Sequence, residues 1–128
     1  MAVLQPFSLL AKLLFATDDG KPQVEHTAQG DGQFTTLAAG TLTVLGASTT
    51  PVPFGTTPAA GAKAVQLEYL ADAVNLQPIQ VTFNGGTDQM EISPGGSFTY
   101  HNPNPVAGLT GMTLAHTTNG TVNYRVLG

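Results

Sequence analysis

The residues that could carry chemistry are few and far apart. The three histidines, His26, His101 and His116, could in principle hold zinc, but they lack the close ligand spacing of a zinc site. A glycosidase needs two carboxylates that face each other. Asp88 and Glu91 lie close in the sequence, but at opposite parity in one strand they would point to different faces. We therefore predict no catalytic residues, no metal site and no cofactor, and hence no enzyme.

Shorter motifs support the same interpretation. The acidic turns at 18–20 and 31–32 lack the full ligand spacing of a calcium loop. The segment 46–48 does not match the G-x-S-x-G motif of a nucleophilic serine. The glycines do not occur in a strand–glycine loop–helix unit, which a nucleotide site would need. The sequence thus favours contact surfaces over reaction chemistry.

The chain of 128 residues has the length of one domain but very little charge. Charged residues make up 9% of it, whereas an ordinary soluble domain has about 25%. The four basic residues (Lys12, Lys21, Lys63 and Arg125) are scattered and the net charge is -4, which argues against a nucleic-acid groove. Without cysteine, neither a disulfide nor a thiolate metal site is possible. Charge normally discourages association, so its scarcity favours a subunit of an assembly; a secreted β domain with a neutral polar surface is the alternative.

From residue 33 onward, short segments alternate apolar and polar residues, which is typical of strands. Between two of these segments, the Pro- and Gly-broken stretch 49–62 is unlike a central strand. About eight strands separated by turns predict an all-β fold, an antiparallel β-sandwich of jelly-roll or immunoglobulin-like type. The expected strands are 33–38, 41–46, 64–70, 79–83, 89–93, 97–101, 109–117 and 121–128.

Turn signals and parity define the expected hairpins and core. Asn84-Gly85 and Asn119-Gly120 tolerate the positive φ that a tight reversal needs, and Pro94-Gly95 suits the centre of a type II turn. Ala39-Gly40 is expected to separate the first two strands. The predicted core residues are Val65, Leu67, Ile79, Val81, Phe83, Ile92, Phe98, Leu114, Val122, Tyr124 and Val126.

Residues 1–32 are predicted to form an arm that precedes the sandwich domain of residues 33–128. Leu9, Leu10, Leu13 and Leu14 follow helical spacing, which predicts a short helix, and the polar segment 18–32 reads as a loop or extended arm. A signal peptide is disfavoured because no basic residue precedes the apolar run, and the run is too short to span a bilayer. Such an arm is most useful on another subunit; folding back over its own sheet is the alternative.

The layout resembles small structural proteins of tailed-bacteriophage virions. The resemblance lies in the Thr-, Gly- and Ala-rich, cysteine-free composition, in the order of arm and sandwich, and in two segments, QVTFNGGTDQMEISPGGSFTY and the terminal TVNYRVLG. It covers most of residues 34–128. In size and layout the chain is most similar to capsid decoration, or cement, proteins. That resemblance implies a position on the outside of the shell, often as a trimer, with the arm gripping capsid subunits.

The sequence therefore predicts a non-enzymatic virion protein that binds and stabilises the outer surface of a phage capsid through subunit contacts. Tail, neck or fibre-adaptor subunits are one alternative, and a glycan-binding β-sandwich module is another. The expected partners are the major capsid protein, other virion subunits and copies of the chain itself, favouring a trimer, with neither nucleic acid nor membrane. The loop 101–105 is expected to be exposed and stiffened by proline, so it should lose little conformational entropy when it binds a partner. The predicted contact residues are Leu9, Leu10, Leu13, Leu14, Phe15, His101, Asn102 and Asn104.

Overall fold

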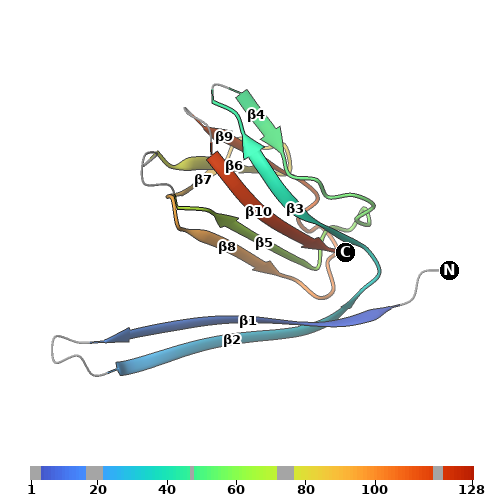
Figure 1. Ribbon diagram of the computed structural model, residues 1–128. Coiled ribbons are helices and arrows are strands. Elements are labelled where there is room, and N and C mark those ends of the chain that lie inside the picture. Colours follow the sequence, from blue (N-terminus) through green and yellow to red (C-terminus); the bar gives the residue numbers. More distant parts are fainter. Residues whose placement is uncertain (1–3, 17–21, 47, 72–76, 117–119) are drawn as a thin grey trace.

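The protein is all-β, as the alternation predicted. The computed structural model describes residues 4–16, 22–46, 48–71, 77–116 and 120–128, and all regular structure there is antiparallel strand (Figure 1). Within those ranges no helix is long and apolar enough to cross a membrane. The strands are β1 (Gln5–Ala16), β2 (Pro22–Phe34), β3 (Leu37–Val44), β4 (Ser48–Pro51), β5 (Ala64–Tyr69), β6 (Ile79–Phe83), β7 (Gln89–Ile92), β8 (Ser97–His101), β9 (Met112–His116) and β10 (Gly120–Leu127).

Eight of these strands form a sandwich of two four-stranded sheets, with the orders β3-β10-β5-β8 and β4-β9-β6-β7. The pairings are nested around the β6–β7 hairpin: β5 pairs with β8, β4 with β9, and β3 with β10. Apart from the β6–β7 hairpin, every connection from β3 to β10 passes from one sheet to the other. The predicted antiparallel sandwich is therefore confirmed.

The core lies between the two sheets, where strand alternation places the apolar residues. Along β5, for example, Val65, Leu67 and Tyr69 are buried, whereas Gln66 and Glu68 are exposed. Most of the predicted core is buried. The exceptions, Phe83, Phe98 and Tyr124, are half-buried and pack against the core at its margin.

Two of the predicted turns are confirmed by their backbone geometry. Asn84 and Gly85 have φ of 53° and 67°, so both central residues of the β6–β7 reversal are left-handed. The Asn84 side chain also holds the neighbouring loop, because its Oδ1 accepts a hydrogen bond of 2.7 Å from the Thr110 N–H. Gly95, after Pro94, has a φ of 84°, as a type II turn requires. Asn119 lies outside the described residues.

The turn expected at Ala39-Gly40 is wrong, because β3 runs straight through it. Gly40 is paired with Tyr124 in an uninterrupted register between β3 and β10. A side chain at residue 40 would place its Cβ 3.1 Å from the Tyr124 hydroxyl. Glycine at this position therefore allows the close approach of an aromatic ring, and it does not reverse the chain. The stretch 49–62 is mostly loop, but its start belongs to the edge strand β4.

The helix predicted around residues 9–15 is also wrong. This segment belongs to β1, which pairs with β2 from Gln5 opposite Phe34 to Phe15 opposite Val24. The stretch expected to be a loop contributes most of β2. The apolar spacing in β1 suits a helix locally, but the long-range backbone pairing with β2 determines its conformation. The β1–β2 hairpin, here called the hairpin arm, is a separate two-stranded sheet that extends away from the sandwich (Figure 1).

Candidate functional site

The outer face of the β3-β10-β5-β8 sheet carries cross-strand rows of very different character. Residues directly opposite each other on paired strands share a face, so the register defines the rows. One row is largely apolar and the two beside it are polar. The rows are Leu37, Leu127, Ala64 and His101; Ala39, Arg125, Gln66 and Thr99; and Thr41, Asn123, Glu68 and Ser97.

The base of the hairpin arm contacts the His101 end of the apolar row, whereas Leu37 at the other end is 59% exposed. The Phe7 ring meets the His101 ring edge-on, with centroids 5.7 Å apart and planes at 80°, and lies 6.1 Å from the Phe34 ring. The Lys63 ammonium donates a 2.7 Å hydrogen bond to the Gln33 carbonyl oxygen. Ala64 is only 4% exposed although its row faces outward, so the arm shields this end of the sheet.

A groove of about 480 Å³ remains between the arm and the sheet. Phe7, Leu9 and Phe34 line it from the arm, and Leu37 and Leu127 line it from the sheet. Leu9, a predicted contact residue, is half-buried here. The other predicted contacts of the arm, Leu10, Leu13, Leu14 and Phe15, are placed in β1 by their backbone; their side chains lie outside the described part of the chain.

His101 packs against the arm and is not exposed. It ends β8, is half-buried, and its Nε2 atom is buried without a hydrogen-bond partner among the described residues. Asn102 is held by a 2.8 Å bond from its N–H to the Lys63 carbonyl and by a 3.3 Å contact from its Nδ2 to the Tyr100 hydroxyl. Of the predicted loop contacts, only Asn104 is exposed. His101 and Asn102 thus anchor the fold beside the arm.

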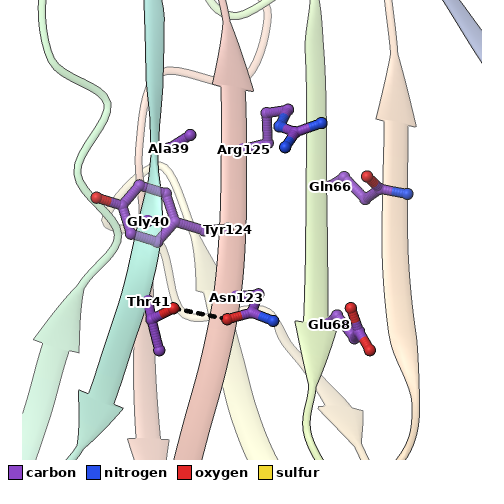
Figure 2. A pocket seen from close by; sticks show the side chains of 8 residues that line it. All are labelled: Ala39, Gly40, Thr41, Gln66, Glu68, Asn123, Tyr124 and Arg125. Atoms are coloured by element: carbon purple, nitrogen blue, oxygen red, sulfur yellow. Dashed lines mark hydrogen bonds between the residues drawn. The ribbon is translucent and has the colours of Figure 1, made fainter.

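The two polar rows form a second candidate site, a shallow depression of about 480 Å³ that is here called the polar depression (Figure 2). The Thr41 hydroxyl donates a 2.8 Å hydrogen bond to Asn123 Oδ1 across β3 and β10. The side chains of Gln66, Glu68 and Arg125 make no hydrogen bond or ion pair with another described residue. The lining consists of Ala39, Gly40, Thr41, Gln66, Glu68, Asn123, Tyr124 and Arg125.

The acidic and histidine side chains do not form a metal-binding group in the described ranges. No group of three or more His, Asp or Glu residues there could hold a metal ion. Asp88 and Glu91 are both exposed, and Glu91 accepts a 3.2 Å hydrogen bond from Gln80 Nε2. The side chains of His26 and His116 lie outside the described part of the structure.

Sequence reasoning missed both Phe7 and Lys63 at the base of the arm. Each contacts a segment far away in the sequence, and nothing local marks these contacts. The polar depression did leave a signal, since polar residues recur at every second position in β5 and β10, notably Gln66 with Glu68 and Asn123 with Arg125. What the signal lacks is the register that joins the two pairs.

Comparison of the chain with protein-family models, curated proteins and solved structures found no significant match.

Proposed function

We propose that the protein is a non-enzymatic structural subunit of a tailed-phage virion that binds and stabilises the outer surface of the capsid. The hairpin arm would make the contacts, with the major capsid protein, another virion subunit or further copies of the chain, favouring a trimer. The proposal rests on the sequence resemblance together with three physical features of the chain: the order of its strands, the open strand edges of the arm and the scarcity of charge.

The strand order supports a jelly-roll, the finer form of the predicted sandwich. In a jelly-roll, eight antiparallel strands form two sheets through two Greek keys, an architecture found in viral capsid and lectin domains. The nested pairings around β6 and β7, with alternate crossing between the sheets, are what this architecture requires. Because a fold alone does not define a function, this order is consistent with a virion protein without being sufficient for one.

The single observation that carries the proposal is the hairpin arm. Its strands contain 12 and 13 residues, so at about 3.3 Å per residue the arm is about 40 Å long. In the described part of the chain, β1 and β2 pair only with each other, which leaves both outer edges open. An isolated two-stranded hairpin is marginally stable in water, and open edges invite pairing with another chain. Such an arm needs a surface to lie on.

The register of the arm supports an apolar partner surface. Leu9 is paired with Gly30, Leu13 with His26 and Phe15 with Val24, so these positions of one parity carry no formal charge when histidine is neutral. The sandwich cannot supply the whole of this surface, because the arm contacts it at its base and then extends away (Figure 1). A neighbouring subunit would supply the rest. The apolar area buried there would stabilise the contact by about 25 cal/mol per Å², before the entropy cost of ordering the arm is subtracted.

The decisive experiment uses particles of the virus that encodes the chain. Mass spectrometry should find the protein in purified virions, and immunogold labelling should place it on the head. Particles that lack the protein should lose heat stability and regain it when the full chain is added. A chain without residues 1–32 should keep its sandwich fold, measured by circular dichroism, but should neither bind nor stabilise particles.

Two results would overturn the proposal. If the shortened chain binds and stabilises particles as well as the full chain does, the arm does not make the contact. Labelling confined to the tail or neck would instead favour the tail, neck or fibre-adaptor alternative. Glu68→Ala, a substitution in the polar depression at a residue that does not line the groove beside the arm, serves as the matched control and should leave particle binding unchanged.

A further inference from the structure

The polar depression concentrates hydrogen-bonding groups, two of them charged, in a chain of which charged residues make up only 9%. Arg125 and Gln66 are opposite each other on β10 and β5, and Asn123 and Glu68 are the next outward-facing pair. Neighbouring strands lie about 4.8 Å apart, and alternate residues along a strand are about 7 Å apart. Two carboxamides, one carboxylate and one guanidinium therefore occupy the corners of a small rectangle on a rigid sheet (Figure 2).

These groups have unused hydrogen-bonding capacity. Asn123 Oδ1 accepts the Thr41 hydroxyl, which orients the carboxamide and leaves its Nδ2 available as a donor. Gln66 offers a donor and an acceptor, Glu68 offers two acceptor oxygens, and Arg125 offers a planar set of donors. None of these last three side chains is engaged by another described residue. The depression can thus donate and accept hydrogen bonds over a distance of a few ångströms.

The opposite sheet provides an internal comparison. Gln89 and Glu91 on β7 repeat the spacing of Gln66 and Glu68 on β5, and both are exposed. There, however, the Glu91 carboxylate accepts a hydrogen bond from Gln80 Nε2 on the neighbouring strand. Polar residues on an outer face of this sandwich can therefore satisfy one another, as Thr41 and Asn123 also do, whereas Gln66, Glu68 and Arg125 bond to no other described side chain.

The shape of the site favours a small ligand over a flat protein surface. The lining residues from β3, which are Ala39, Gly40 and Thr41, are small, and the polar side chains of Gln66, Glu68, Asn123 and Arg125 come from β5 and β10. The resulting volume of about 480 Å³ lies in the usual range for small-molecule sites. A flat partner sheet would leave this hollow unfilled.

We infer that the polar depression binds a neutral saccharide. Adjacent hydroxyl groups of a sugar ring each donate and accept, so they match a site that mixes carboxamide, carboxylate and guanidinium groups at this spacing. A phosphate or sulfate group would be attracted by Arg125, the one cationic residue in the lining, but repelled by the Glu68 carboxylate at the diagonal corner, so an anionic ligand is disfavoured. The inference is independent of the proposed capsid function.

A single site of this kind binds weakly, because it is shallow and polar and its hydrogen bonds replace those made with water. Repetition compensates for this weakness, since linked copies bind a polymer with an avidity far above that of one site. The ligand class is therefore a repeating neutral glycan, and binding should be strongest when several copies of the chain are joined.

The test is an array of neutral, sialylated and sulfated oligosaccharides, followed by calorimetric titration with the strongest neutral ligand. The full chain should bind neutral glycans. Gln66→Ala combined with Glu68→Gln should weaken binding by about tenfold or more, because the Gln66 carboxamide is removed and one acceptor oxygen of Glu68 is replaced by a donor. Gln89→Ala combined with Glu91→Gln makes the same chemical changes on the other sheet and should leave the affinity unchanged. Circular dichroism establishes that both variants are folded.

Three results would overturn the inference. They are the absence of binding to any neutral glycan, binding confined to sialylated or sulfated glycans, and equal losses in the two double variants. If the full chain binds no neutral glycan and the Gln66 and Glu68 variant changes the sedimentation of the protein, the depression is a contact between copies of the chain. Each of these outcomes concerns the isolated protein, so none depends on whether the arm binds a capsid.

Discussion

Replacing Phe7 with alanine should release the hairpin arm from the sandwich while the sandwich itself stays folded. Phe7 on β1 contacts the sheet directly, since its ring packs edge-on against His101 on β8, and it also lies tilted against Phe34 at the end of β2. Its side chain is half-buried, and the fully buried core lies between the two sheets and away from this contact. The loss should therefore fall on the docking of the arm.

The magnitude follows from burial. Removing a fully buried phenylalanine ring costs ~3–5 kcal/mol, so a half-buried ring should contribute about 2 kcal/mol. Since 1.4 kcal/mol corresponds to a factor of ten, the population of released arm should rise about 30-fold. A released hairpin is only marginally stable by itself, so its backbone amides should exchange faster as well.

Hydrogen exchange read separately for β1 and β2 and for the buried strands β5 and β6 measures this effect. Gly32→Ala is an independent perturbation of the same contact, because a Cβ at residue 32 would lie 2.7 Å from Phe7 Cε1 and would displace the ring. Gly111→Ala is the matched control, since its Cβ would meet no atom within 4 Å. The reasoning is refuted if Phe7→Ala leaves exchange in the arm unchanged, or if it accelerates exchange equally in β5 and β6.

Two further predictions concern stability. Leu67→Ala should lower the free energy of unfolding by ~2–5 kcal/mol, because Leu67 is fully buried, and Phe83→Ala should cost less than the ~3–5 kcal/mol of an enclosed ring, because Phe83 is half-buried. Chemical denaturation measures both, and a full-sized loss for Phe83 would contradict its marginal position. Asn84→Ala should cost about 1–3 kcal/mol in thermal unfolding, because its carboxamide accepts backbone N–H groups of the neighbouring loop and its φ is left-handed. Asn84→Gly should recover only the part of this loss that comes from the left-handed backbone. If Asn84→Gly is as stable as the native chain, the carboxamide hydrogen bonds do not contribute to stability.

The sandwich was predictable from the sequence where its determinants are local. In β5 to β8, alternation and the Asn84-Gly85 and Pro94-Gly95 turns all lie within a few residues of what they specify. Val52 and Leu109 were not predicted to be buried, although both belong to the core. They lie outside the regular strands, so their burial depends on how the chain closes over the ends of the sandwich and leaves no periodic signal.

Pairing over long distances explains the remaining differences. From the sequence alone, Gly40 could belong to a strand or to a turn. Its place in a strand becomes clear only from its pairing with Tyr124 on β10, whose ring lies close to it. The candidate site was partly predictable for the same reason. Leu9 and His101 were named as contact residues, but Phe7, which joins the arm to His101, was not. The polar rows likewise become a site only when β5 and β10 are placed side by side.

The edges of the sheets provide the strongest physical argument that the arm has a partner. Proteins protect exposed edges by keeping edge strands short, and three of the four sandwich edges follow this rule: β4 and β7 have 4 residues each and β8 has 5, whereas the edge strand β3 has 8. The arm does the opposite, with strands of 12 and 13 residues and, in the described structure, no neighbour on either side. A chain that limits its edges in one part and extends them in another has different requirements in the two parts. The short edges keep the sandwich from pairing at random, and the long edges of the arm are suited to pairing or packing with one particular surface. This contrast supports an assembly contact more directly than the scarcity of charge does, because it assigns the contact to a named element.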